Sequence, residues 1–597
     1  MARTTDKRSA ATVRTVKVAA AQCEVGKDVA ANTATLVRMV TQASERGAEL
    51  VVLPEFGNHL SVYESAQHAW DVAIDVADPA DDFVVALAGV ARETGAWVVA
   101  NATVRRIPAK DDQPPRITVT QLLFSPDDGL VAHGDKQVLM GAERIHLSGS
   151  DETTEVVDTP VGRIGLYCCM DGVVNEPARA LAVGGAEILC NSLNSFALDE
   201  ASLHVPVRAA ENGLWVVACC KVGPLLPPER VDEFAGALGV PGSTFTGAGE
   251  SQIVSPDGSV VVIGPAEGEA IIMAEIDLAA SRARRRPDGT DLLAMRRPEI
   301  YGPVAADIEP LPATAADSVE TVMIQSGAGD IDALASAVCS AVGDGADVIV
   351  LPELATEVDG IVSNPADASL AGRALVESLE AALDGADALV VTSVVEADHA
   401  DGAAGPGTGD AAYSHAGVVI SADGVVLHQP ALQCPLRHAE WQTVLGDRQK
   451  VFVSPFGRLS VLVGDDVLVP EAARLAVLGG AEVVAVPFST AEKADLSLIL
   501  PERAAENRVC LAAASRPGPT GASGAFEPPV NPVWSRPDRP APFDRTINEP
   551  ERHLADPSAG SFRVTLHPLR TVEKLVTTDT DLVYGRRPEL RGPLVAR

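Results

Sequence analysis

Short apolar runs alternate with amphipathic stretches along the first half of the chain. Residues 16–21 predict a buried strand, and the apolar positions within residues 30–46 recur at helical spacing. A strand over residues 49–55 and a helix over residues 82–94 repeat this pair, and a further strand is expected over residues 96–104. Strands that alternate with helices in this way predict a layered α/β fold.

The same alternation continues to about residue 264. The remaining expected elements are strands at 118–124, 130–133, 162–168, 187–190 and 215–220, helices at 177–183 and 201–212, and a hairpin at 251–264. The hairpin turns at a Pro-Asp-Gly sequence, which is typical of a tight turn.

One segment of this framework occurs twice in the chain. Residues 162–171 are followed by Glu176, and residues 457–466 are followed by Glu471. The offset is constant, because 457 − 162 and 471 − 176 are both 295. Internal duplication over so long a period indicates two structural units of similar architecture.

A second motif marks the end of each copy. The sequence Arg-Arg-Pro-Glu begins at Arg296 and again at Arg586. The stretch that follows the first of these motifs is rich in Ala, Pro and Asp, which is typical of a linker.

These repeats predict the domain organisation. Residues 1–14 are expected to be a flexible tail, residues 15–305 a first unit, residues 306–318 a linker and residues 319–597 a second unit. Residues from about 516 to 560 are rich in Pro, Arg and Asp and show little periodicity, so we expect an irregular insertion there.

Composition narrows the functional classes. The net charge is −35 and the pI is about 4.6, which argues against a nucleic-acid or anionic-membrane partner. No run of 18 or more apolar residues occurs, so no membrane span is expected. The nine cysteines include no Cys-x-x-Cys pair, which argues against a zinc ribbon and suits a reducing, cytoplasmic location.

Three reactive side chains lie at or just after the ends of expected strands: Glu55, Lys136 and Cys169. Alone, each has a simpler interpretation, as a solvated acid, a surface lysine and a buried thiol. Together they supply a proton acceptor, a cation and a nucleophile, which is the set that catalysis by a thiol requires. Cys168 faces the opposite side of an extended segment, so we assign it to the core.

The second copy lacks most of this set. The offset of 295 places Gly464 at the position of Cys169 and Ala431 at the position of Lys136, whereas the acid survives as Glu353. Glycine cannot act as a nucleophile, and alanine cannot stabilise an oxyanion. We therefore interpret the second unit as a degenerate, non-catalytic copy.

The motifs around these residues resemble the nitrilase, or carbon–nitrogen hydrolase, superfamily. The matching segments are 52–55, 136–144 and 164–176; the resemblance covers nearly all of 15–303 and extends more weakly over 319–597. It implies two tandem αββα sandwich domains, of which the first carries a Glu-Lys-Cys triad, with no metal and no organic cofactor.

The resemblance also implies a role for each residue. Cys169 would attack a small amide to form a thioester, and Lys136 would favour the thiolate. The Lys136 ammonium and the backbone N–H of Met170 would stabilise the oxyanion. Glu55 would transfer protons. Glu143, seven residues after Lys136, would position the substrate or the lysine.

The choice of reaction depends on the residues beside the nucleophile. Cys169 begins the sequence Cys-Met-Asp-Gly, which is closer to amidases than to nitrilases, whereas Glu143-Arg144 is reminiscent of nitrilases. Asn175 stands where the family commonly has a proline. An amidase is our first prediction and a nitrilase the second. Acyl transfer through the same thioester and a non-catalytic scaffold remain as alternatives.

The resemblance bears on partners as well. We expect a small-molecule amide or nitrile substrate. Family members commonly dimerise through helices, so the second unit is expected to serve as an intramolecular pseudo-dimer partner, and a higher homo-oligomer is plausible. Residues shared by both copies, among them Asp171, Glu176 and Glu211, are expected to be structural because they persist where catalysis should not.

Overall fold

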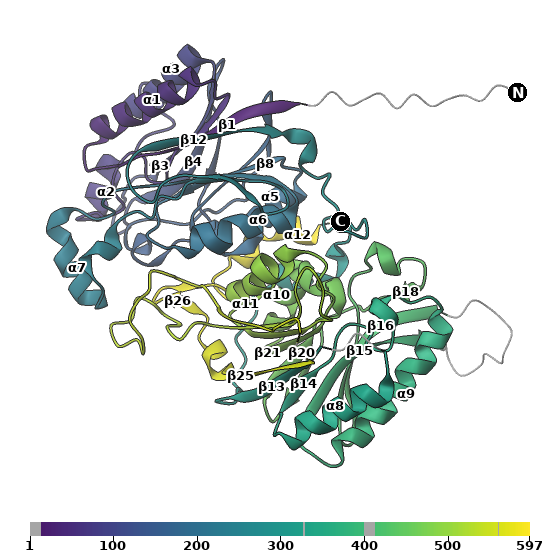
Figure 1. Cartoon of the computed structure of the whole chain (residues 1–597). Helices are drawn as coiled ribbons and strands as arrows, with labels where there is room; N and C mark the ends of the chain where they lie inside the picture. Colours follow the sequence, from purple (N-terminus) through teal and green to yellow (C-terminus); the bar gives the residue numbers. More distant parts are fainter. Residues whose placement is uncertain (1–13, 326–328, 399–411, 559, 597) are drawn as a thin grey trace, which may run out of the picture.

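The computed structural model describes residues 14–325, 329–398, 412–558 and 560–596 (Figure 1). Residues 1–13 of the expected tail therefore lie outside the described residues. Within the described residues, no helix combines the length and the apolar character needed to cross a membrane. We refer to residues 15–305 as the first unit and to residues 319–597 as the second unit.

The first unit contains two six-stranded sheets. In spatial order, one consists of β12 (Ala270–Asp277), β1 (Thr15–Gln22), β2 (Leu50–Val52), β3 (Trp97–Ile107), β4 (Arg116–Ser125) and β5 (Gly129–Asp135). The other consists of β11 (Val260–Ile263), β10 (Gln252–Val254), β9 (Trp215–Cys220), β8 (Ile188–Leu193), β7 (Gly162–Cys168) and β6 (Val157–Thr159).

These two sheets pack face to face and are covered by helices on their outer faces. Apolar residues from both sheets, such as Val18, Leu50, Ile164 and Val217, are fully buried in one shared cluster. Helices α1 (Val29–Glu45) and α3 (Asp82–Thr94) cover the first sheet, and α5 (Asn175–Val183) and α6 (Val205–Asn212) cover the second. Asp28 caps α1 by accepting hydrogen bonds from two backbone N–H groups of its first turn.

The second unit repeats this arrangement. One sheet has the order β17 (Gly424–Pro430), β16 (Ala412–Ser421), β15 (Leu389–Asp398), β14 (Val348–Val350), β13 (Val319–Ile324) and β25 (Ser561–Leu566), and β18 (Gln442–Val444) pairs with β16. The other has the order β19 (Val451–Ser454), β20 (Gly457–Val461), β21 (Val483–Pro487), β22 (Cys510–Ala514), β23 (Gly524–Glu527) and β24 (Glu551–Leu554).

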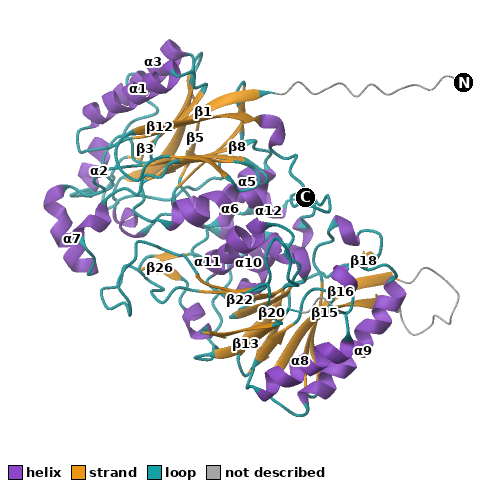
Figure 2. Ribbon diagram, in the orientation of Figure 1, coloured by secondary structure: helices purple, strands orange, loops and turns teal. Residues whose placement is uncertain are grey.

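The two units face each other through helices. The outermost helices of the second unit are α8 (Ile331–Gly343) and α9 (Pro365–Leu383), whereas α10 (Pro470–Leu478) and α11 (Leu500–Asn507) lie at the junction against α5 and α6 (Figures 1 and 2). Each unit therefore has the layer order helix, sheet, sheet, helix, as the expected αββα architecture requires.

Buried ion pairs join the units reciprocally. They are Arg179–Glu471 at 3.1 Å, Arg474–Glu176 at 2.9 Å, Arg208–Glu506 at 2.8 Å, and Arg503–Glu211. Each pair is related to another by the offset of 295: Arg474 is the copy of Arg179, and Glu471 is the copy of Glu176. An arginine of either unit therefore pairs with a glutamate of the other unit. This is the contact pattern of an isologous two-fold interface, here formed within one chain.

The closing segments of the two units are exchanged across this interface. Tyr301 Oη, from the first unit, accepts a hydrogen bond from Gln433 Nε2 at 2.9 Å. Arg591, just before α12 (Gly592–Val595) of the second unit, donates Nη1 to Gln137 Oε1. The end of the first unit therefore packs beside the segment that follows Ala431, and the end of the second unit packs beside the segment that follows Lys136.

Most elements expected from the sequence are confirmed, with three differences. Residues 516–560, expected to be irregular, include β23 and β24, which pair with each other; helices and strands are absent between them, over described residues 528–550. The expected helix 201–212 opens with a π-helical segment, Glu200–His204, before α6. Elements of the first unit that were not expected include β6, β12, α2 (Ala66–Val72) and α7 (Val231–Leu238).

Candidate active site

Glu55 lies in a tight loop that follows β2. The backbone N–H of Leu53 still pairs with Val99 O at 2.9 Å, and the chain then turns at Phe56, whose φ is 54°. Asn101 Oδ1 accepts from the Phe56 N–H at 2.9 Å and holds this turn. A positive φ is unusual for a residue other than glycine, so the loop is constrained. As a result, the Glu55 side chain is 0% exposed.

Lys136 directly follows β5 and links two carboxylates. Its Nζ donates to Glu55 Oε1 and to Glu143 Oε1, both at 2.8 Å. The other oxygen of Glu143 accepts from the Met140 N–H at 2.9 Å. The lysine is also 0% exposed, so its ion pair with Glu55 is fully shielded from water, whereas the pair with Glu143 is partly exposed. Three of the residues expected in the site are thereby joined.

Cys169 lies in the sharp turn between β7 and α4 (Met170–Val173). Its φ of 50° and ψ of −113° are strained for a residue with a side chain, and its N–H donates to Asn191 Oδ1 at 3.0 Å. The side chain is 5% exposed. Met170 is the first residue of α4, and the first N–H groups of a helix have no acceptor within it. Cys168 is buried in a separate apolar cluster, as expected.

Asp171 ties the cysteine turn to the lysine loop. Its carboxylate accepts from the backbone N–H of Gln137 at 3.1 Å and of Val138 at 2.8 Å. Burial raises its pKa to about 6, although these two bonds oppose the shift. Asp466 makes the same two bonds in the second unit, to Leu432 and Gln433. This confirms the structural role expected for Asp171.

The electrostatics of the cluster describe its resting state. Burial and the Glu55 charge raise the pKa of Cys169 well above its ordinary value, although Lys136 opposes the shift. Burial likewise raises the pKa of Glu55. Burial disfavours the Lys136 ammonium, but the acidic groups of Cys169, Glu143 and Glu55 hold its pKa well above normal. Burial therefore favours the neutral form of the thiol, and formation of the thiolate requires a base.

Two further buried ionisable groups were missed by the sequence analysis. Lys221 directly follows β9, and burial lowers its pKa to about 8 against the opposing charge of Glu55. Burial raises the pKa of Glu200 to about 8. Lys221 could have been found from its position at a strand end. Glu200 could not have been found by comparing the two copies, because the residue at the offset of 295 is also an acid, Asp495.

The second unit braces the loops of this cluster. Thr580 Oγ1, at the start of β27 (Thr580–Asp581), accepts from the Gly141 N–H at 2.9 Å, and β27 pairs with β26 (Leu575–Thr577). Trp534 and Leu582 belong to the same buried apolar cluster as Val138 and Met170. Residues of the insertion and of the closing hairpin therefore support both the lysine loop and the cysteine turn.

The equivalent place in the second unit has different chemistry. Gly464 keeps the positive φ of the cysteine turn, at 55°, but a Cβ there would lie 2.4 Å from Glu353 Oε1. Arg437 pairs with Glu353 at 2.9 Å and with Asp465 at 2.7 Å. Ala431, in the lysine position, is buried. The carboxylate of Glu353 thus occupies the space of the absent nucleophile.

Two histidines complete this second cluster. His438 stands at the offset of 295 from Glu143, and its ring lies 5.1 Å from that of His415. Burial and His438 lower the pKa of His415 to about 3. Burial opposes ionisation of Glu353, but Arg437, with smaller contributions from His438 and His415, lowers its pKa to about 2. Glu353 is therefore ionised and both rings favour the neutral form.

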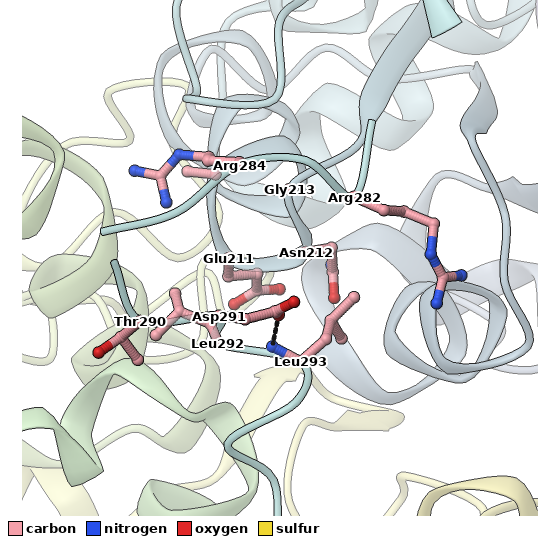
Figure 3. A pocket seen from close by; sticks show the side chains of 10 residues that line it. Glu211, Asn212, Gly213, Arg282, Arg284, Thr290, Asp291, Leu292 and Leu293 are labelled. Atoms are coloured by element: carbon pink, nitrogen blue, oxygen red, sulfur yellow. Dashed lines mark hydrogen bonds between the residues drawn. The ribbon is translucent and has the colours of Figure 1, made fainter. Parts of the chain in front are cut away.

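Several cavities in the described part of the chain lie outside the first-unit cluster, and two of them adjoin ionisable side chains. A small one of about 20 Å³, beside Glu211, Asn212 and Asp291 at the end of α6, has room for about one water molecule (Figure 3). In it, the Leu293 N–H donates to Asp291 Oδ1 at 3.0 Å. A larger cavity of about 190 Å³ is lined by Glu353, Arg437 and His438, among others.

Comparison with known proteins gives two matches to a single family model. Residues 17–286 and 292–533 each match the model described as carbon–nitrogen hydrolase. A nitrilase of Pyrococcus abyssi is 28% identical over 264 residues, which are 44% of this chain and 90% of that protein. A chloroplastic omega-amidase of Arabidopsis thaliana is 29% identical over 293 residues, which are 47% of this chain and 72% of that protein.

Further relatives have related names. An N-carbamoylputrescine amidase of Solanum lycopersicum is 25% identical over 302 residues, which are 48% of this chain and 94% of that protein. Among solved structures, an amidase from Nesterenkonia sp. is 21% identical, with a TM-score of 0.38, and the match covers 49% of this chain and 98% of that chain.

Proposed function

This chain belongs to the carbon–nitrogen hydrolase family and is an amidase-type hydrolase of carbon–nitrogen bonds other than peptide bonds; we propose that its first unit cleaves a small amide through a thioester. The products would be a carboxylate and ammonia or an amine. The observation that carries this proposal is the pairing of buried Lys136 with buried Glu55 and partly buried Glu143, beside the strained turn of Cys169; of these four residues, the second unit keeps only the first acid.

In the first step, Cys169 Sγ attacks the amide carbon while its proton passes to Glu55. The high pKa of the buried thiol makes this base necessary, and the raised pKa of Glu55 makes that carboxylate a stronger proton acceptor. The carbonyl oxygen becomes an oxyanion, which the Lys136 ammonium and the backbone N–H of Met170 stabilise.

In the later steps, the same groups act in reverse order. Glu55 donates its proton to the nitrogen as the C–N bond breaks, which leaves a thioester on Cys169. A water molecule then gives a proton to Glu55 and attacks the thioester carbon, and the released thiolate regains the proton. Glu143 remains paired with Lys136 and keeps the ammonium pointed at the reacting oxygen.

The burial of the cluster supports a small substrate, since Cys169 is 5% exposed and Glu55 and Lys136 are inaccessible. Nitriles are the second candidate, because one relative is named a nitrilase. An acceptor other than water would make the same thioester a transferase intermediate. We further propose that the second unit is a non-catalytic partner, and that any higher homo-oligomer is built from this two-unit chain.

The first test is a measurement of ammonia release from a panel of small amides, carbamoyl compounds and nitriles. Wild type is compared with Cys169→Ala and with the matched control Cys434→Ala, whose thiol lies in the second unit. Release that is lost only in Cys169→Ala supports the proposal and identifies the substrate class. Equal release in all three proteins contradicts it. Hydroxamate formation with added hydroxylamine separates acyl transfer from hydrolysis.

A further inference from the structure

The second unit keeps a polar cavity beside its degenerate cluster. The cavity has a volume of about 190 Å³, and its lining includes Glu353, Arg437 and His438 together with Arg286 and Asp288 of the first unit.

Two residues of this lining, Glu353 and His438, form with the adjacent His415 the ligand set of a transition metal. Glu353, His415 and His438 each offer one ligand atom, and these three atoms all lie within 4.8 Å of one another. All three residues are buried. An ion bound at about 2.0–2.2 Å from each atom would need only small movements of the side chains.

The hydrogen bonding of the two rings favours an additional ligand. Within the described residues, neither ring nitrogen of His438 has a hydrogen-bond partner of good geometry, although the residue is 2% exposed. Buried polar groups without a partner are rare and costly. His415 Nε2 bonds Ser393 Oγ at 2.9 Å, which leaves Nδ1 directed toward Glu353. This is the outer-shell contact that fixes a metal-binding imidazole.

The local charge also favours a cation. Arg437 lies 2.9 Å from Glu353, 2.7 Å from Asp465 and 3.6 Å from Asp288, so one guanidinium faces three carboxylates. A divalent ion would offset the two remaining negative charges. Arg437 would stay anchored through its bidentate contact with Asp465.

We propose that Glu353, His415 and His438 form a binding site for a divalent transition metal ion of the Zn²⁺ type, open to the cavity. Two imidazoles and one carboxylate suit such an ion better than Mg²⁺ or Ca²⁺, which prefer oxygen ligands. A second group, Glu527, Glu551 and His553, is less suitable, because Glu551 and His553 are only partly buried, whereas all three residues of the first group are buried. The proposal does not depend on hydrolysis at Cys169.

The test uses the full-length chain with Cys169→Ala, so that this thiol cannot bind the ion. The protein is stripped with EDTA, titrated with Zn²⁺ and with Co²⁺, desalted, and analysed for bound metal and for visible Co²⁺ absorption. One tightly bound equivalent per chain is expected. His438→Gln should weaken binding by more than the roughly 10- to 100-fold that loss of an outer-shell partner costs.

The matched control is His428→Gln, a half-exposed histidine of the same unit, which should keep one equivalent. Equal uptake by His438→Gln and its parent would mean adventitious surface binding and would overturn the proposal. If His438→Gln fails to fold, the parent protein still decides: its thermal transition should rise with Zn²⁺ and fall with EDTA. Absence of stoichiometric uptake by the parent also overturns the site.

Discussion

Glu55 and Glu353 occupy equivalent places in the two units, yet their proton affinities are shifted in opposite directions. Burial raises the pKa of Glu55, which shares Lys136 with another carboxylate. Burial acts on Glu353 as well, but Arg437, together with smaller contributions from His438 and His415, lowers the pKa to about 2. The comparison teaches that the framework sets the position of the acid, whereas the neighbouring cation decides whether it can accept a proton.

The interface between the units shows the opposite behaviour, because its ion pairs are the same in both copies. Each pair contributes an arginine from one unit and a glutamate from the other, in both directions. Loss of one partner would leave the other residue buried, charged and without a counter-ion. The interface therefore preserves residues that catalysis does not require. Mutation can separate the residues kept for the interface from those kept for catalysis.

The largest effect is expected from the nucleophile. Cys169→Ala should lower kcat/KM by about 10⁴-fold or more, because loss of a nucleophile removes the covalent pathway. Steady-state kinetics on the best substrate of the panel measure this loss, and Cys434→Ala should stay close to wild type. Activity of Cys169→Ala within tenfold of wild type would place the nucleophile elsewhere.

The next effect concerns stability and tests the symmetry of the interface. Glu211→Ala and Glu506→Ala should each lower the free energy of unfolding by about 3–5 kcal/mol, because both leave Arg208 and Arg503 short of a counter-ion. Urea unfolding monitored by circular dichroism measures both. The exposed Glu229→Ala should leave the free energy of unfolding close to that of wild type. Clearly unequal effects of the two interface variants would contradict an energetically symmetric junction.

A smaller effect on catalysis is expected from the exchanged segments. Arg591→Ala removes the contact with Gln137, which directly follows Lys136, so kcat should fall by about 10- to 100-fold as the lysine loop loses its position. Tyr301→Phe removes the corresponding contact with Gln433 in the other unit and should leave kcat unchanged. A loss of kcat in both variants, in proportion to their loss of stability, would indicate a purely structural role.

Some helices and strands of the fold could be predicted from the sequence, and others could not. The helix expected at 82–94 is α3, and the strand expected at 162–168 is β7, because both follow local apolar periodicity. Strand β12 was missed, since its pairing partner β1 lies about 250 residues earlier in the chain. Helix α7 was missed although Val231, Phe234 and Leu238 recur at helical spacing and pack against a small apolar cluster, because the segment is only eight residues long.

The candidate site likewise has features that the sequence predicts and features that depend on tertiary contacts. Motif order predicted Glu55, Lys136, Glu143 and Cys169; in the structure Lys136 pairs with both glutamates, and Cys169 lies near Lys136 and Glu55. The expectation that Lys136 favours the thiolate describes only one contribution to the pKa of Cys169, because burial and the Glu55 carboxylate act in the opposite direction. Proton affinity depends on tertiary contacts, and so does the bracing by Trp534, which no local pattern encodes.

The smallest effect is a pH dependence at the interface. Burial opposes ionisation of Glu471, but Arg179 and Arg296 outweigh it and lower its pKa from 4.5 to about 2. A carboxyl whose folded pKa is depressed stabilises the protein above its unfolded pKa, and this contribution is lost as pH falls through the folded pKa. The unfolding free energy of wild type should therefore exceed that of Glu471→Gln at pH 7, and the difference should shrink between about pH 4.5 and 2.

Urea unfolding of both proteins at closely spaced pH values, over the range in which both stay folded, measures this difference. Glu176→Gln is the matched control from the other unit, because Arg474 and Arg591 also lower the pKa of Glu176 against burial. Its difference from wild type should shrink in the same direction. A difference for Glu471→Gln that stays constant as pH falls would mean that Glu471 does not titrate with a depressed pKa, and that the ion pair stabilises the junction less than its geometry indicates.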